Sequence, residues 1–308
     1  MSNPADPPAT ADAATDGGDD AWTVRRIVVA LDASAASAAA AAGAARIAAR
    51  LSAGLHGLFV EDAALLRVAG LPGCVEIGTF SASRRSLSGA EVERRLRAQA
   101  ARARRLLAAS ALAAAVEDHR FEVLRGEVRQ TLAEAVGDAD LLSLGRVGTS
   151  GLTRLGSVAR GALAGRRGHL LLLPAGGRIE PPLVAVYGES AAARRALRAA
   201  LDLFDRRQAD RPAPRSGSLT VLVVTEGGEP EVAERLEAEA GAVIAAGGHS
   251  PALARFRRVL PGDHHALSLT VARSRANVLL LPADSPLVRS EDLESVVAGL
   301  DCSVLLVR

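Results

Sequence analysis

Runs of aliphatic residues alternate along the chain with segments whose apolar positions recur at helical spacing. Aliphatic runs predict strands at 25–31, 55–60, 121–124, 141–144 and 170–173, and again at 183–187, 219–224, 256–260, 278–281 and 304–307. Helical patterns lie between them, the longest at 34–51, 90–115, 190–204 and 231–246. Continuous aliphatic runs are typical of strands buried on both faces, and alternation of strands with helices is typical of a parallel, doubly wound sheet. We therefore expect an α/β fold.

The same order of elements occurs twice in the chain. The segment 121–127 is similar to 256–263, and Ala-Asp-Leu-Leu at 139–142 is similar to Ala-Asn-Val-Leu at 276–279. A repeat of about 150 residues favours an internal duplication. We expect two tandem, doubly wound, parallel five-stranded sheets, in residues 23–176 and 177–308, after a disordered tail at 1–22 that is rich in Pro, Ala, Asp and Gly.

Composition excludes several classes of chemistry. The 308 residues carry a formal charge of +2, and every basic residue is arginine. Without lysine there is no Walker A motif and no pyridoxal Schiff base. Two cysteines, Cys74 and Cys302, form no metal-binding pattern, and the charge balance indicates no nucleic-acid partner. No signal peptide or membrane-spanning run is present, so we expect a cytoplasmic protein without a membrane partner or a metal site.

Candidate chemistry follows the first and fourth strands, whose carboxyl ends should meet where ligands bind in such sheets. Asp32 comes after the first strand, and the glycine-rich loop 145–157 comes after the fourth. Backbone N–H groups of glycine loops and helix N-termini bind phosphate oxygens, and Arg146 and Arg154 are candidates to add positive charge. The alternatives are that Asp32 is a helix N-cap and that the loop is an ordinary connection.

Two motifs together resemble the universal stress protein family over residues 24–308. They are Ile-Val-Val-Ala-Leu-Asp-Ala-Ser at 27–34 and Gly145-x2-Gly148…Gly156-Ser157. The resemblance implies an adenine-nucleotide α-hydrolase-like fold that binds ATP or another adenine nucleotide such as AMP. Asp32 would then contact the adenine or ribose, the backbone near Val60 would flank the base, and Gly145, Gly148, Gly156 and Ser157 would hold the phosphates. The loop is two residues shorter than the family motif G-x2-G-x9-G-[ST].

The second half departs further from that motif. Gly188 stands in the place of Asp32, and Pro-Ala-Asp-Ser-Pro at 282–286 contains no glycine. Because proline lacks an N–H group, we expect the second half to be degenerate and nucleotide binding to be confined to the first. The resemblance also implies that the two fifth strands, Leu170–Leu173 and Val304–Val307, pair within the chain as an intramolecular pseudo-dimer.

Three functions stay open at this point. The first is a stress-response protein that binds an adenine nucleotide, without enzyme activity except for weak ATP hydrolysis, which is left open. The second is a nucleotide-free tandem stress protein that contacts an unknown protein partner through the apolar insertion at 61–89. The third, an ATP-cleaving adenylating enzyme on a related fold, lacks a visible acid–base pair near the loop.

Overall fold

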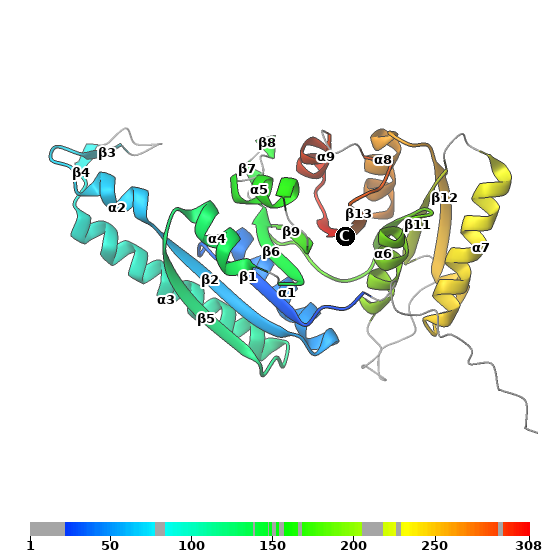
Figure 1. Ribbon diagram of the computed structural model, residues 1–308, viewed down its shortest axis with the longest axis horizontal. Coiled ribbons are helices and arrows are strands. Elements are labelled where there is room, and N and C mark those ends of the chain that lie inside the picture. Colours follow the sequence, from blue (N-terminus) through cyan, green and yellow to red (C-terminus); the bar gives the residue numbers. More distant parts are fainter. Residues whose placement is uncertain are drawn as a thin grey trace, which may run out of the picture.

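A single ten-stranded sheet runs through the molecule (Figure 1). The computed structural model describes residues 22–77, 84–137, 139–146, 148–149, 152–153, 157–165, 168–204, 218–225, 229–288 and 292–308. The strand order is β12-β11-β10-β13-β14-β9-β6-β1-β2-β5. The strands are β1 (Arg26–Ala30), β2 (Gly54–Asp62), β5 (His119–Gly126), β6 (Leu141–Arg146), β9 (His169–Pro174), β10 (Leu183–Tyr187), β11 (Leu219–Val224), β12 (Ala254–Val259), β13 (Val278–Pro282) and β14 (Ser303–Val307).

Each half of the chain contributes five adjacent strands in the same relative order. The first half gives β5-β2-β1-β6-β9 and the second gives β12-β11-β10-β13-β14, and all neighbours within a half are parallel. The predicted α/β class with two doubly wound units is therefore confirmed. The two predicted sheets are not separate, because they join edge to edge.

The two halves meet where β9 pairs with β14, and we call this pairing the seam. The strands are antiparallel, with Leu170 opposite Leu306, Leu171 opposite Leu305 and Leu172 opposite Val304. The expected pairing of the two fifth strands is confirmed. Antiparallel pairing of equivalent strands relates the halves by a pseudo-two-fold axis, and it covers two apolar edges that would otherwise be open to aggregation.

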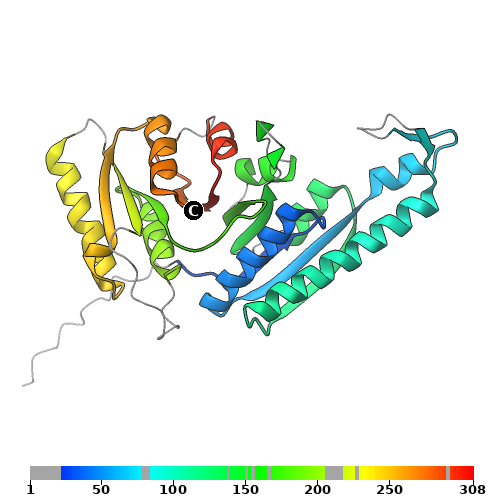
Figure 2. The same cartoon turned by 180° about the vertical axis from the view of Figure 1, so that it is seen from behind.

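Helices cover both faces of the sheet. One apolar core lies under α1 (Ala35–Leu51), α3 (Gly89–Ala113), α6 (Ala191–Asp202) and α7 (Pro230–Ala246), and Figure 2 shows α1 and α3 on the near side. The other core lies under α4 (Val128–Val136), α5 (Ser157–Gly165), α8 (His264–Ser274) and α9 (Leu293–Gly299). Both faces of the inner strands are therefore buried, which explains their continuous aliphatic runs. No helix among the described residues is long and apolar enough to cross a membrane.

The segment after β2, which the sequence left as an irregular insertion, contains regular structure. It forms α2 (Ala63–Ala69) and a hairpin of β3 (Val75–Ile77) and β4 (Arg84–Ser86). The Asp62 carboxylate starts α2 by accepting the N–H groups of Ala64 at 2.8 Å and Leu65 at 3.4 Å. Together with the connection 70–74 and the first turns of α3, these elements project from the body of the molecule, and we call them the arm (Figure 1).

The described part of the chain begins at the last residue of the predicted tail. Trp22, placed at the end of the tail from the sequence, is 5% exposed and packs in the core. Its ring centroid lies 6.1 Å from that of His169, at the start of β9. Burial of this large ring beside the seam makes Trp22 part of the N-terminal unit. The rest of the predicted tail lies outside the described residues.

Candidate functional site

A cavity of about 360 Å³ opens at the carboxyl ends of β1, β2 and β6, and we call it the N-terminal cavity. The chain passes from β1 to its neighbour β2 and later to β6 on the other side of β1, so the cavity lies at the switch point of this half. Asp32, Val60 and Gly145 all line it. The structure thus brings together three of the residues that the sequence singled out, one from the end of each strand.

Asp32 organises the turn from β1 into α1. Its Oδ1 accepts the N–H of Ser34 at 2.9 Å, while the N-cap of α1 is Ser34, whose hydroxyl accepts the N–H of Ser37 at 3.1 Å. The alternative that Asp32 is the N-cap is therefore wrong. Ala33 between them has φ of 62°, a left-handed conformation that is uncommon for a residue other than glycine. The Asp32 side chain is exposed at the cavity, and no donor among the described residues bonds its Oδ2.

Gly145 permits the close approach of α1 to β6. A Cβ atom at this position would lie 2.5 Å from the carbonyl carbon of Ala36 and 2.6 Å from the backbone nitrogen of Ser37. Any larger residue would push the first turn of α1 away from the strand. The glycine is thus needed for packing, and this packing places the first turn of α1 in the cavity wall, where Ser37 is a lining residue.

The glycine-rich loop is partly described. Gly148 belongs to a two-residue strand, β7 (Gly148–Thr149), which pairs with β8 (Leu152–Thr153). The sequence analysis did not predict this small hairpin. Ser157 is the first residue of α5, as predicted for a helix start after the loop. Gly156 and Arg154 lie outside the described residues, so phosphate binding by the loop stays a prediction.

Arg146 has a different role from the one suggested by its place in the loop. Its side chain is 1% exposed, and its guanidinium donates to the backbone carbonyls of Val297, Leu300 and, at 3.2 Å, Cys302. These carbonyls lie at the C-terminal end of α9 and just beyond it, in the other half of the chain. Burial lowers the pKa of this guanidinium from its usual value. The idea that Arg146 adds charge to a phosphate site is therefore wrong, since it ties the halves together.

Two further polar residues line the N-terminal cavity without having been predicted. Asp62 is the last residue of β2, and its place at the carboxyl end of a strand was a usable signal. Gln99 is an exposed residue of α3, far along the chain from the strands whose ends form the cavity. Only the packing of α3 beside β2 brings it there, so no local pattern marks it.

The chain was compared with families, curated proteins and solved structures. No protein-family model and no curated protein matches the chain. A universal stress protein from Archaeoglobus fulgidus superposes with a TM-score of 0.62 at 14% identity, covering 91% of this chain and 97% of that one. The chain has the universal stress protein fold. UspA from Lactobacillus plantarum matches at 23% identity and a TM-score of 0.35, over 50% of this chain and 98% of that one. A universal stress protein in complex with cAMP matches at 21% identity and 0.30, over 49% and 96%.

The second unit of this universal stress protein fold also contains a cavity, of about 460 Å³, which we call the C-terminal cavity. The strand registers make it the counterpart of the first, since Ile27 pairs with Leu55 and Leu141 as Leu183 pairs with Leu219 and Val278. The lining differs in chemistry: Tyr187 replaces Leu31, Gly188 replaces Asp32, Ala193 replaces Ser37 and Pro282 replaces Gly145. The second half thus keeps a cavity at this place, while the residues that line it differ from those of the first half.

Proposed function

We propose that the protein is a universal stress protein whose N-terminal half binds an adenine nucleotide, ATP or AMP. The observation that supports this most is the meeting of Asp32, Val60 and Gly145 in one cavity at the switch point of the sheet. Its volume, about 360 Å³, lies within the usual range for small-molecule sites. The apolar lining of Leu58, Val60 and Leu96 suits a purine base, and the open Oδ2 of Asp32 suits a ribose hydroxyl or an exocyclic amine.

The phosphates would extend toward the loop between β6 and α5. Helix N-termini offer N–H groups without intrahelical partners, and α5 begins at Ser157 at the end of that loop. Gly148, Gly156 and Ser157 keep their proposed role as phosphate ligands. The proposal assigns binding to this site and includes no catalytic step.

Nucleotide affinity of an Asp32→Ala variant tests the proposal. Loss of the carboxylate removes a hydrogen bond to a charged group, which is worth about 1.5–3 kcal/mol, so we expect calorimetric ATP and AMP affinities to fall roughly 10- to 100-fold. Gly188→Ala is the matched control in the other half, because its new Cβ would meet only the Val224 carbonyl oxygen at 3.8 Å. Equal losses in both variants, or no binding by the wild type at millimolar nucleotide, would contradict the proposal.

The arm favours a second candidate function, contact with a protein partner. It carries five exposed apolar side chains, of which Leu71 is 61% and Ile77 59% exposed. The others are Leu65, Val68 and Val75. Exposed apolar residues gathered on one projecting element are typical of interaction sites.

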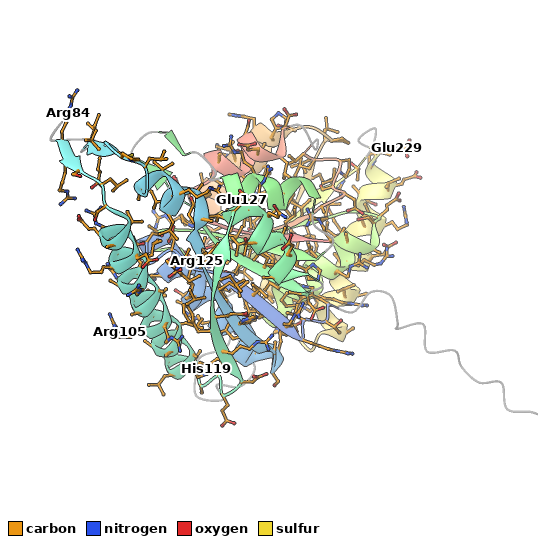
Figure 3. All side chains as sticks on the ribbon, turned by 60° about the vertical axis from the view of Figure 1, so that its left-hand side comes forward. Arg84, Arg105, His119, Arg125, Glu127 and Glu229 are labelled. Atoms are coloured by element: carbon orange, nitrogen blue, oxygen red, sulfur yellow. The ribbon has the colours of Figure 1, made fainter. Side chains whose placement is uncertain are left out.

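The positive charge of the arm indicates what kind of partner it would bind. Arg67, Arg84 and Arg94 are exposed, and among the described residues none of them has an acidic partner. Figure 3 shows Arg84 at the tip of the arm and Arg105 along α3, both pointing away from the body. We propose that the arm binds an acidic protein segment that carries apolar side chains.

A designed peptide with leucines on one helical face and glutamates on the other tests this surface. We expect saturable binding whose affinity falls as the salt concentration rises. In a Leu71→Asp variant the affinity should fall at least tenfold, because the change removes apolar area and adds a negative charge that repels the peptide's glutamates. The same peptide with arginines in place of glutamates is the control. Equal affinity for both peptides, or an unchanged affinity in Leu71→Asp, would argue against the arm as this docking site.

A further inference from the structure

We infer that the N-terminal segment, residues 1–21, docks on the outer face of α3 within the same chain. The segment carries five aspartates and no arginine, whereas α3 carries six arginines and only two glutamates. The aspartates of the segment are Asp6, Asp12, Asp16, Asp19 and Asp20. This contact is independent of nucleotide binding and of any partner of the arm.

The outer face of α3 carries positive charge that the described part of the chain does not neutralise. Both glutamates of α3 lie near its start, where they pair with Arg95 and Arg97. Further along, Arg102 and Arg105 are exposed and have no acidic partner among the described residues. Figure 3 shows Arg105 pointing away from the body of the molecule. Exposed residues at helical spacing continue this face: Ala98, Ala101, Ala108 and Leu112.

The described chain begins on the same face of the sheet as α3. The Trp22 side chain packs in the core that lies under α1, α3, α6 and α7, beside His169 at the start of β9. Four strand spacings of about 4.8 Å separate β9 from β5, against which α3 packs, so α3 lies roughly 20 Å from Trp22 across the sheet. At about 3.3 Å per residue, residues 1–21 span up to about 70 Å, which is enough to reach along α3.

Charge favours α3 over the other helices on this face. In the second half, α7 packs against β11, which is also four strands from β9, so reach alone does not distinguish α7 from α3. However, α7 carries four glutamates and one arginine and would repel the segment. The arginines of α1 and α6 are half-buried. Exposed ion pairs are weak one by one, but a tethered segment acts at an effective concentration of about a millimolar, so several weak pairs are sufficient.

Disulfide cross-linking in the full chain tests the contact, in a Cys74→Ser background where Cys302 is buried. Ala13→Cys places one thiol in the N-terminal segment, and Ala101→Cys places the other at an exposed position of α3. With diamide as the oxidant at low salt, we expect this pair to form an intramolecular disulfide at least tenfold faster than Ala13→Cys with Ala238→Cys, the matched exposed alanine of α7. Salt at about 1 M should remove most of the difference, because it shortens the screening length to about 3 Å.

Two charge variants test whether the arginines of α3 hold the segment. Arg102→Gln combined with Arg105→Gln should slow the cross-linking to Ala101→Cys at least threefold, because it removes two of the attracting charges. Arg255→Gln combined with Arg257→Gln removes the same charge from exposed positions of β12 and should leave the rate unchanged. The inference is overturned if the α3 and α7 cysteines react equally fast at low salt, if the two charge variants react at the same rate, or if the product is a covalent dimer, which would assign the face to a second copy of the chain.

Discussion

A lysine in place of Leu172 is expected to break the seam between the two halves. Leu172 is 1% exposed and lies opposite Val304 in the antiparallel pairing of β9 and β14. Its side chain belongs to the core under α5 and α9, where no described acidic residue is among the buried neighbours. An uncompensated buried charge costs about 3–5 kcal/mol, which is a large part of the stability of an ordinary domain. We expect a fall in melting temperature of about 10 °C, with aggregation through the exposed edges.

Thermal denaturation followed by size-exclusion chromatography measures this effect. Leu306→Lys should behave in the same way, because Leu306 faces Leu170 across the seam and is also 1% exposed. Leu112→Lys is the matched control, since that leucine is 82% exposed on α3 and should tolerate the charge. If Leu172→Lys is as stable and as monodisperse as Leu112→Lys, the seam does not hold the halves together.

The sheet could be predicted from the sequence because its inner strands are buried on both faces. Leu170–Leu173 and Leu183–Tyr187 are continuous apolar runs for that reason, and their order along the chain repeats. The arm was not predicted, because α2 has seven residues and β3 and β4 have three each. Elements this short contain too few positions for a period to be recognised, and their exposed apolar side chains do not follow the usual inward pattern.

Only some residues of the candidate site could be predicted from local sequence patterns. Asp32 and Gly145 stand at strand ends, so the sheet topology brings them together without further information. Gln99 reaches the N-terminal cavity through helix packing, which no motif records. Arg146 was misread because an arginine beside a glycine loop is typical of a phosphate site. The carbonyls of Val297 and Leu300 that bind it lie 151 and 154 positions away along the chain.

Two arginines, one at each end of the seam, donate hydrogen bonds from one half of the chain to the other. Arg146 donates to the carbonyls of Val297 and Cys302, which precede β14. Arg308, just after β14, donates to the carbonyls of Leu163 at 2.9 Å and Gly168 at 3.0 Å, which precede β9 at the corresponding positions. Each half thus supplies a cation to the last carbonyls of a helix in the other half, where the helix dipole favours positive charge.

Arg146→Met is expected to destabilise the protein by about 3 kcal/mol or more. The substitution keeps an apolar stem but leaves three carbonyl groups without their donor, and each buried unsatisfied group costs about 1–3 kcal/mol. Arg308→Met should cost less, since Arg308 is only partly buried and water can reach the carbonyls it leaves. Denaturant unfolding followed by the fluorescence of Trp22, which packs against His169 beside the seam, measures both changes.

The thiol of Cys302 gives a local readout of the same change. Cys302 is 6% exposed, its carbonyl accepts from Arg146, and burial raises the pKa of its thiol to about 11. Because the thiolate is the reactive form, Cys302 should resist alkylation in the folded wild type at neutral pH. In Arg146→Met, loosening of the seam should expose Cys302 and speed its labelling at least tenfold, measured in a Cys74→Ser background. Arg105→Met, at an exposed position on α3, should leave both stability and labelling unchanged. Equal labelling rates in the two variants would show that Arg146 does not hold this end of the seam closed.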